Sequence, residues 1–208
     1  MDKTHDLRHW RRQQLWTNVL AAWVLLLVGA ALTYGLMVLI APDLAGLQSF
    51  LKQAVSGLKN DTNWQMALNI AWHNERAVWL VVILALIPVP LLYWVNLVGT
   101  AASIGLVLYI NASHTPVGLL ILAGILPHGI IEISSFAVAV GLASQLNYYV
   151  RSRTQNWRAH RYDWIGQLKW WPFIKPLLRL YLLVVVPGLL IAAAIEGFIT
   201  PWLLTLVR

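Results

Sequence analysis

Long apolar segments separated by shorter polar stretches run through this chain from end to end. The first apolar run, residues 15–41, is longer than the about 20 residues that cross a bilayer as a helix. A cleaved signal peptide would have a shorter apolar core, so we predict a retained membrane-spanning helix here. The polar arm before it, residues 1–14, carries the basic residues Lys3, Arg8, Arg11 and Arg12.

Residues 42–75 are mixed in charge and are predicted to form a loop outside the membrane. Asp61 or Asn63 offers a cap for a helix that begins near Trp64 and leads into the membrane. Earlier in the loop, apolar residues recur every three or four positions. This spacing is typical of an amphipathic helix, which either lies at the membrane interface or packs on its own neighbours. The residues are Leu44, Leu47, Leu51, Val55 and Leu58.

The central part of the chain, residues 76–147, contains further apolar segments. Pro88 and Pro90 are predicted to end or kink the second span, because proline lacks the helical N–H group. Pro127 divides the following apolar block into residues 117–126, which either re-enter or cross the membrane, and a further span that starts at the proline. The spans predicted here are 76–90, 94–110 and 128–147.

Segment 148–175 is the most basic part of the chain, with tryptophans interleaved and Asp163 as its one acid. Positive charge beside membrane spans marks the cytoplasmic side, and tryptophans favour the headgroup level. The last span begins near residue 176, and the remainder, 176–208, also contains a short apolar tail. Five crossings then place the N-terminus in the cytoplasm and the C-terminus outside, in a multi-pass protein of the cell membrane.

Composition excludes a soluble domain, because 59% of the residues are hydrophobic and only 11% are charged. We predict one membrane domain, residues 1–208, with an all-α fold: a polytopic bundle of about five transmembrane helices. Cysteine is absent, which excludes thiolate metal sites and disulfides. The net charge is +7, but no nucleic-acid recognition motif accompanies it. We therefore expect the basic residues to contact anionic headgroups of the lipid bilayer, and no nucleic acid.

Glu132 is the only charged residue between Arg76 and Arg151, and it follows His128 by four positions. A carboxylate in the hydrocarbon core costs about 2.5 to 3.5 kcal/mol on insertion scales, so it needs a partner. Residues four apart lie on one face of a helix, so His128 and Glu132 can touch. Glu196, in the last span, shares a helix face with small residues that let a neighbouring helix come close. We predict an intramembrane polar core of these three side chains.

Three interpretations of the polar core stay open at this point. It can fix the packing of the bundle through hydrogen bonds, or it can line a path for a ligand, an ion or a proton. It can also serve catalysis, since an imidazole and two carboxylates supply three metal ligands on paper, although the sequence identifies neither a metal nor another cofactor. The His-Glu-x-x-His and Gly-x-Ser-x-Gly signatures are absent, which weakens the enzyme interpretation.

Two polar stretches in apolar surroundings resemble the motifs of a membrane-protein family. They are Leu-Pro-His-Gly-Ile-Ile-Glu at residues 126–132 and Ala-Ala-Ala-Ile-Glu-Gly-Phe-Ile-Thr-Pro at residues 192–201. With the basic segment between them, they resemble the stage II sporulation protein M family over about residues 64–201. Asn74 and Asn96 match single residues of two further family motifs. The other matching residues are Pro127, His128, Gly129, Glu132, Glu196, Gly197, Thr200 and Pro201.

The resemblance implies a helical membrane protein that acts with partners. Family members in spore-forming bacteria are membrane subunits of a peptidoglycan-degrading engulfment complex, in which they anchor or scaffold extracytoplasmic hydrolases. Other members occur near genes for the production of circular bacteriocins and immunity to them, or with transporter-like partners. The resemblance assigns no role to the individual motif residues.

Our leading hypothesis is a non-enzymatic integral membrane subunit that scaffolds or anchors a membrane or cell-envelope complex, with a protein partner. The alternative is a transport or bacteriocin-immunity component with an intramembrane His/Glu pathway. A second alternative is an intramembrane metal-dependent hydrolase. Small-residue pairs also permit a homo-oligomer, although we favour their use within one chain. These pairs are Ala101/Gly105 and Ala137/Gly141.

Overall fold

The computed structural model describes residues 3–40, 43, 46, 49, 63–112, 116–158 and 163–206. Every regular element in these residues is helical, which confirms the predicted all-α fold. The apolar stripe predicted between residues 44 and 58 lies outside the described residues. The α-helices are α1 (Lys3–Ile40), α3 (Asn63–Ala85), α4 (Val95–Asn111), α5 (Val117–Leu119), α6 (Leu126–Arg158), α7 (Trp170–Leu180), α8 (Val186–Ala194) and α9 (Thr200–Leu206). Short 3₁₀ turns are η2 (Leu92–Trp94) and η4 (Ile165–Gln167), and π-helical turns are η3 (Leu120–Ile125), η5 (Tyr181–Val185) and η6 (Ile195–Ile199).

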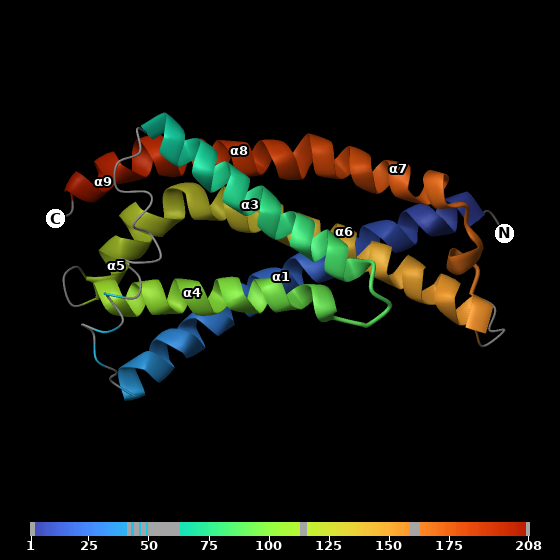
Figure 1. Ribbon diagram of the computed structural model, residues 1–208, viewed down its shortest axis with the longest axis horizontal. Helices are drawn as coiled ribbons and strands as arrows, with labels where there is room; N and C mark the ends of the chain where they lie inside the picture. Colours follow the sequence, from blue (N-terminus) through green and yellow to red (C-terminus); the bar gives the residue numbers. More distant parts are fainter. Residues whose placement is uncertain are drawn as a thin grey trace.

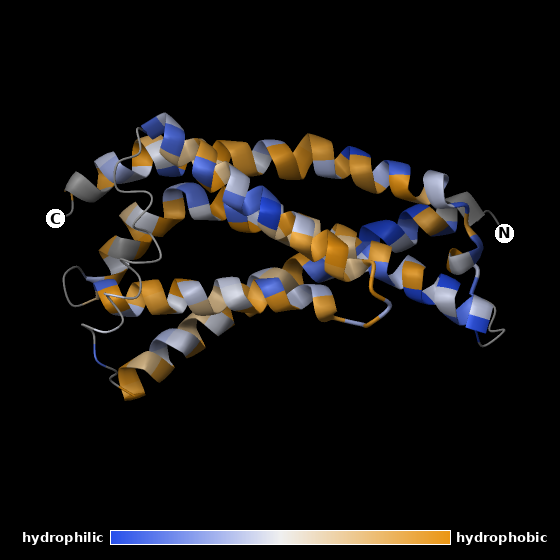
Figure 2. Cartoon of the chain, in the orientation of Figure 1, coloured by the Kyte–Doolittle hydropathy of each residue, from blue (hydrophilic) through white to orange (hydrophobic). Residues whose placement is uncertain are grey.

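The helices form an elongated bundle around α6 (Figure 1). Helix α1 packs against α4 and α6, while α8 packs against α6 and α3. The N-terminal end of α1 and the connection between α6 and α7 lie at one end of the bundle, and α9 lies at the other (Figure 1). Hydrophilic residues gather at the first of these ends and on the N-terminal half of α3, whereas α8 is mostly hydrophobic (Figure 2).

The described residues contain four helices that are long and apolar enough to cross a membrane. The helix predicted to begin near Trp64 and to lead into the second span, 76–90, is α3, and it ends at Ala85, before both prolines. Helix α3 is not among the four, because its N-terminal half is polar. The count of five crossings and the placement of the two termini therefore stay predictions. The four helices are Asp6–Ile40, Leu92–Asn111, Val117–Arg158 and Trp170–Leu203.

Pro127 does not break the chain's longest helix, contrary to the predicted division at this residue. Elements α5, η3 and α6 form one continuous helix, Val117–Arg158, which bends near its start (Figure 1). Segment 117–126 thus leads directly into α6, and its re-entry into the membrane stays a prediction. The last helix is also longer than predicted, because it begins at Trp170 rather than near residue 176.

The three π-helical turns share one feature, a proline two residues after the turn ends. In each turn the residue just before the proline donates its N–H to the carbonyl five residues back, as Thr200 does to Ile195. A proline ring clashes with the carbonyl four residues earlier in a regular helix and supplies no N–H. A wider turn relieves that clash and lets the helix continue. The prolines are Pro127, Pro187 and Pro201.

Helix α6 is buried by close contacts at small residues. Nearly all its side chains between Ser135 and Asn147 are buried. A methyl group added at Gly141 would lie 2.8 Å from Leu15 of α1, and one added at Gly188 of α8 would collide with Ser135. Lipid provides no hydrophobic drive between helices, so such close approach supplies the packing energy of the bundle.

Helix α4 meets α1 in the same way, through Gly105 and Ala101. A methyl group added at Gly105 would strike the backbone oxygen of Ala30 and lie 2.7 Å from the Cβ of Thr33. One added at Gly29 would lie 2.9 Å from the Cβ of Ala101. Ala101, Gly105 and Gly141 of the predicted small-residue pairs thus pack against α1 of the same chain. A homo-oligomer through these pairs stays a prediction.

Asn147 ties α6 to the turn that follows α3. Its Nδ2 lies 3.1 Å from the carbonyl oxygen of Ala85, 2.7 Å from that of Ile87 and 3.2 Å from that of Val89. These carbonyls have no further helical turn to bond to, and a buried carbonyl needs a donor. The buried amide therefore holds the end of α3 and sets where the chain turns toward α4.

The basic end of the bundle is also held by specific contacts. The Nη2 of Arg11 donates to the carbonyl oxygen of Phe173 (2.7 Å), and the guanidinium carbon of Arg11 lies 4.6 Å from the centre of the Phe173 ring. Phe173 stacks on Tyr149, with centroids 4.3 Å apart. Asp163 accepts a hydrogen bond from Ser152 (2.7 Å). The N-terminal arm and the start of α7 are thereby joined.

Replacing Gly105 with alanine is expected to destabilise the bundle by about 1–3 kcal/mol, because the added methyl would strike the backbone of α1. The matched control is Gly99→Ala in the same helix, where a methyl meets nothing within 4 Å. That change is expected to be neutral or to stabilise by up to about 1 kcal/mol, since alanine favours a helix over glycine. Thermal unfolding of the detergent-solubilised variants, followed by circular dichroism, measures both effects. Equal melting temperatures would contradict the close approach of α1 and α4.

Candidate functional site

A polar cavity of about 790 Å³ lies between α3, α4, the start of α6 and η6. Residues at its rim, including His73 of α3 and Ser103 of α4, are exposed, so the cavity opens to the outside. Its apolar lining includes Leu80, Leu84 and Phe136. The polar side chains that line it are Asn69, His73, Asn74, Asn96, Thr100, Ser103, His128, Glu132 and Glu196.

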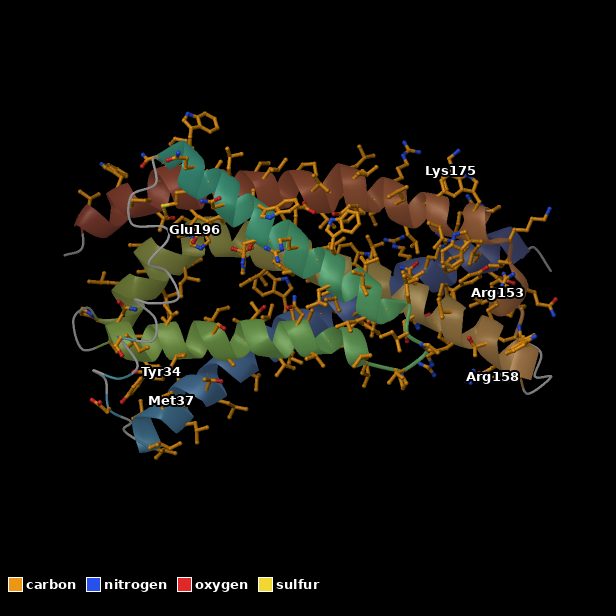
Figure 3. All side chains as sticks on the ribbon, viewed as in Figure 1. Tyr34, Met37, Arg153, Arg158, Lys175 and Glu196 are labelled. Carbon is orange, nitrogen blue, oxygen red and sulfur yellow. The ribbon has the colours of Figure 1, made fainter. Side chains whose placement is uncertain are left out.

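His128, Glu132 and Glu196 form a compact cluster in this cavity. One potential ligand atom from each side chain lies within 4.8 Å of the others. The Nε2 of His128 is 3.8 Å from an oxygen of Glu196, and the two side chains are 12% and 31% exposed. Glu196 lies where the N-terminal half of α3 passes the start of α6 (Figure 3).

Two local features position the cluster. Pro127 and the wide turn before it bend the helix at the point where His128 and Glu132 follow on one face of α6. Glu196 lies inside the wide turn η6. The next residue, Gly197, brings the last helix against α3, since a methyl there would lie 2.8 Å from the Cβ of Ala67.

The ring of His128 has a second partner on the last helix. Its Nδ1 lies 3.2 Å from the Oγ1 of Thr200, which is buried. A hydrogen bond on Nδ1 fixes the orientation of an imidazole and leaves Nε2 to face its other neighbour. Here that neighbour is Glu196, so both contacts of His128 come from the same segment of the last helix.

Asn74 closes the cavity on the side of α3. It is 6% exposed, and its amide lies beside the carboxyl group of Glu132. Its Nδ2 is buried and makes no hydrogen bond of full geometry. On the opposite wall, the Nδ2 of Asn96 donates to the carbonyl oxygen of Ala77 at 3.4 Å, which links α4 to α3.

The structure brings His128, Glu132 and Glu196 together, with Thr200 and Asn74 in contact with the cluster or beside it. The glycines and prolines of the motifs shape the helices rather than line the cavity. Gly129 is buried near Ile125, and Gly197 lies against α3. Pro127 and Pro201 each follow a wide turn. That these side chains act as a polar core inside a membrane stays a prediction.

Sequence reasoning missed a second polar contact between α3 and the last helix. The hydroxyl of Tyr181 donates to Glu75 Oε2 at 2.5 Å, and Glu75 Oε1 is buried without a partner. Glu75 is next to Asn74 in the sequence, but nothing in the local pattern points to a tyrosine so far along the chain. Thr100 and Ser103 were also missed as lining residues, because isolated hydroxyls are common in apolar helices.

The comparison with known protein families shows which family the chain belongs to. Residues 19–201 match the family model described as stage II sporulation protein M. The chain belongs to the stage II sporulation protein M family. The family match begins well before residue 64, where the resemblance seen in the motifs begins, and so includes most of α1 as well as the cavity. With its apolar helices, membership of this family identifies a membrane protein. Neither the curated proteins nor the solved structures contain a match to the chain.

The cavity is expected to be reachable by water-borne reagents. Because the chain has no cysteine, single cysteines can be placed without removing others. Ser103→Cys in the cavity should react with charged methanethiosulfonate ethylammonium at least about tenfold faster than Val98→Cys, since the reactive thiolate is disfavoured in apolar surroundings. Val98 lies on the same helix, is 53% exposed and is not part of the lining. Labelling rates in reconstituted vesicles, read by mass spectrometry, provide the test. Equal rates would show that the cavity is not hydrated.

Proposed function

We propose that this membrane protein is a non-enzymatic subunit that scaffolds or anchors a membrane or cell-envelope complex. The observation that carries the proposal is the polar cavity between α3 and α4, which opens on the flank of the bundle. Large apolar side chains are exposed elsewhere on the same two helices, among them Trp72 of α3 and Val98 of α4, at 66% and 53%, and neither lines the cavity. Such side chains suit lipid, whereas the polar groups of the cavity are suited to hydrogen-bonding a partner.

A helix from a partner subunit would meet this need. Polar side chains hydrogen-bond across helices within membranes, and each such bond contributes about 0.6–2 kcal/mol. Exposed His73 and Ser103 at the rim and the cluster of Glu132 and Glu196 deeper inside offer hydrogen-bonding groups. The Ser103 hydroxyl donates to the carbonyl oxygen of Gly99 and can still accept from a partner. The resemblance to membrane subunits that hold extracytoplasmic hydrolases points the same way.

The shape of the cavity favours binding over conduction. Its lining ends at Phe136 on α6, and the following segment of α6, up to Asn147, is buried by neighbouring helices. A path for an ion or a peptide would have to continue past this segment. The exposed rim of the cavity, at His73 and Ser103, is open to a partner, as a docking site requires.

The basic end supports a second part of the proposal, contact with anionic lipid headgroups. Exposed Trp157 and Trp171, at 76% and 61%, lie near exposed arginines and lysines of the same segment. Tryptophan favours the headgroup level, and each basic residue near an anionic surface contributes about 1 kcal/mol. Arg11 and Phe173 join the N-terminal arm to this segment. That junction supports a cytoplasmic position for both.

Site-specific crosslinking tests the docking of a partner. The photoreactive residue p-benzoylphenylalanine, placed at Ser103 and illuminated in native membranes, should form one discrete crosslinked protein product. Placed at Val98 it should form none, because that position contacts lipid. The double substitution Glu132→Gln, Glu196→Gln should lower the yield at Ser103 roughly fivefold, the equivalent of about 1 kcal/mol of lost hydrogen bonding.

Glu75→Gln is the matched control, because it removes a buried carboxyl group that does not line the cavity. Its crosslink yield should equal that of the wild-type chain, with all variants monodisperse in detergent. A crosslinked product made of two copies of this chain would show that the cavity binds a second copy, and not a different partner protein. Absence of any protein product at Ser103, or equal products at Ser103 and Val98, would refute docking at the cavity.

A further inference from the structure

We propose that His128, Glu132 and Glu196 bind one divalent transition-metal ion in the cavity between α3, α4, α6 and η6. The donor set contains one imidazole and two carboxylates, drawn from two segments far apart in the sequence. The proposal goes beyond the scaffold function, because it concerns a ligand of the isolated chain and needs no partner.

The geometry of the cluster is close to that of a metal site. Zinc binds imidazole nitrogen and carboxylate oxygen at about 2.0–2.2 Å, so tetrahedral ligand atoms lie about 3.4 Å apart. The potential ligand atoms of the three side chains lie within 4.8 Å of one another, and His128 Nε2 is already 3.8 Å from Glu196. Contraction by up to about 1.4 Å is therefore needed, and glutamate side chains can move that far by rotating about their own bonds.

Neighbouring polar side chains orient His128 and Glu132 in the way that outer-shell groups orient metal ligands. The Nδ1 of His128 faces the hydroxyl of Thr200 at 3.2 Å, which leaves Nε2 directed toward the carboxylates. Histidine ligands of metals usually have such a partner on the other ring nitrogen. Asn74 is 6% exposed, its Nδ2 has no full hydrogen bond, and it lies beside Glu132. It is placed to hold the outer oxygen of a carboxylate or to bond a ligand of the ion.

The charge balance of the cavity also favours a cation. Two carboxyl groups lie close together in apolar surroundings, where unpaired charge is costly. Among the residues described by the structure, no lysine or arginine lines the cavity, and histidines are its only basic side chains. A divalent ion would neutralise both carboxylates at once.

The donor atoms narrow the class of ion. Without thiolate or thioether donors the site is unsuited to Cu(I), whereas imidazole with carboxylates suits Zn²⁺, Mn²⁺ and Fe²⁺. Three protein ligands leave one position of a tetrahedral ion for water or another oxygen donor, as in sites that keep an exchangeable ligand. The cavity provides the room for that ligand.

Metal binding to the purified full chain tests the proposal. The protein is prepared with an affinity tag other than polyhistidine, stripped with a chelator, and titrated separately with Zn²⁺ and Mn²⁺. Bound metal is counted by mass spectrometry after desalting, and affinity is measured by calorimetry. The wild-type chain should bind one equivalent. His128→Ala, Glu132→Gln and Glu196→Gln should each weaken binding at least about hundredfold, and Thr200→Val about tenfold, as loss of outer-shell support does elsewhere.

Glu75→Gln serves as the control, since it removes a buried carboxyl group outside the cluster and should still bind one equivalent. Thr200→Val keeps the shape of the side chain, so it reports on the site even where a glutamine variant fails to stay monodisperse. The proposal is wrong if the monodisperse wild-type chain binds neither ion. It is also wrong if the cluster variants, Thr200→Val included, bind as tightly as Glu75→Gln.

Discussion

Close contact between helix backbones holds this bundle together, because lipid gives apolar helices no hydrophobic reason to associate. Helix α6 can be surrounded only because its partners touch it at small residues, such as Gly141 against α1 and Gly188 of α8 against Ser135. The cavity is the complement of that packing. Where α3 and α4 diverge from the turn held by Asn147, no side chain fills the space, and the polar groups of four elements face it.

The sequence predicted the helices and part of the site, for physical reasons that explain its failures as well. Apolar runs longer than a bilayer is thick identified the long helices, and the spacing of four between His128 and Glu132 placed both on one helix face. The charges of Glu75 and Arg76 did not prevent the prediction of a helix here, but they help to keep α3 from being among the four helices apolar enough to cross a membrane. Pro127 suggested a break, whereas a wider turn absorbs the proline and the helix continues.

Contacts between distant segments could not be predicted from one sequence. Asn147 on the carbonyls after α3, Tyr181 on Glu75, and Thr200 on His128 each join residues far apart in the chain. Local patterns carry no information about such pairs. The family motifs identify some members of these pairs, since Glu196 and Thr200 belong to the same motif set as His128, which they contact. The geometry of the cluster depends on how the last helix meets α3, and Gly197 lets the two come close.

Each wide turn contains one residue more than the α-helical turn it replaces, and so rotates the segment beyond it by about 100°. The turn η6 contains Glu196, and Pro201 follows two residues after the turn ends. An ancestral regular helix would acquire the turn by inserting a single residue. When relatives of this chain are aligned, a one-residue gap between Ala194 and Pro201 therefore distinguishes chains with a regular last helix from those whose acid is displaced as it is here.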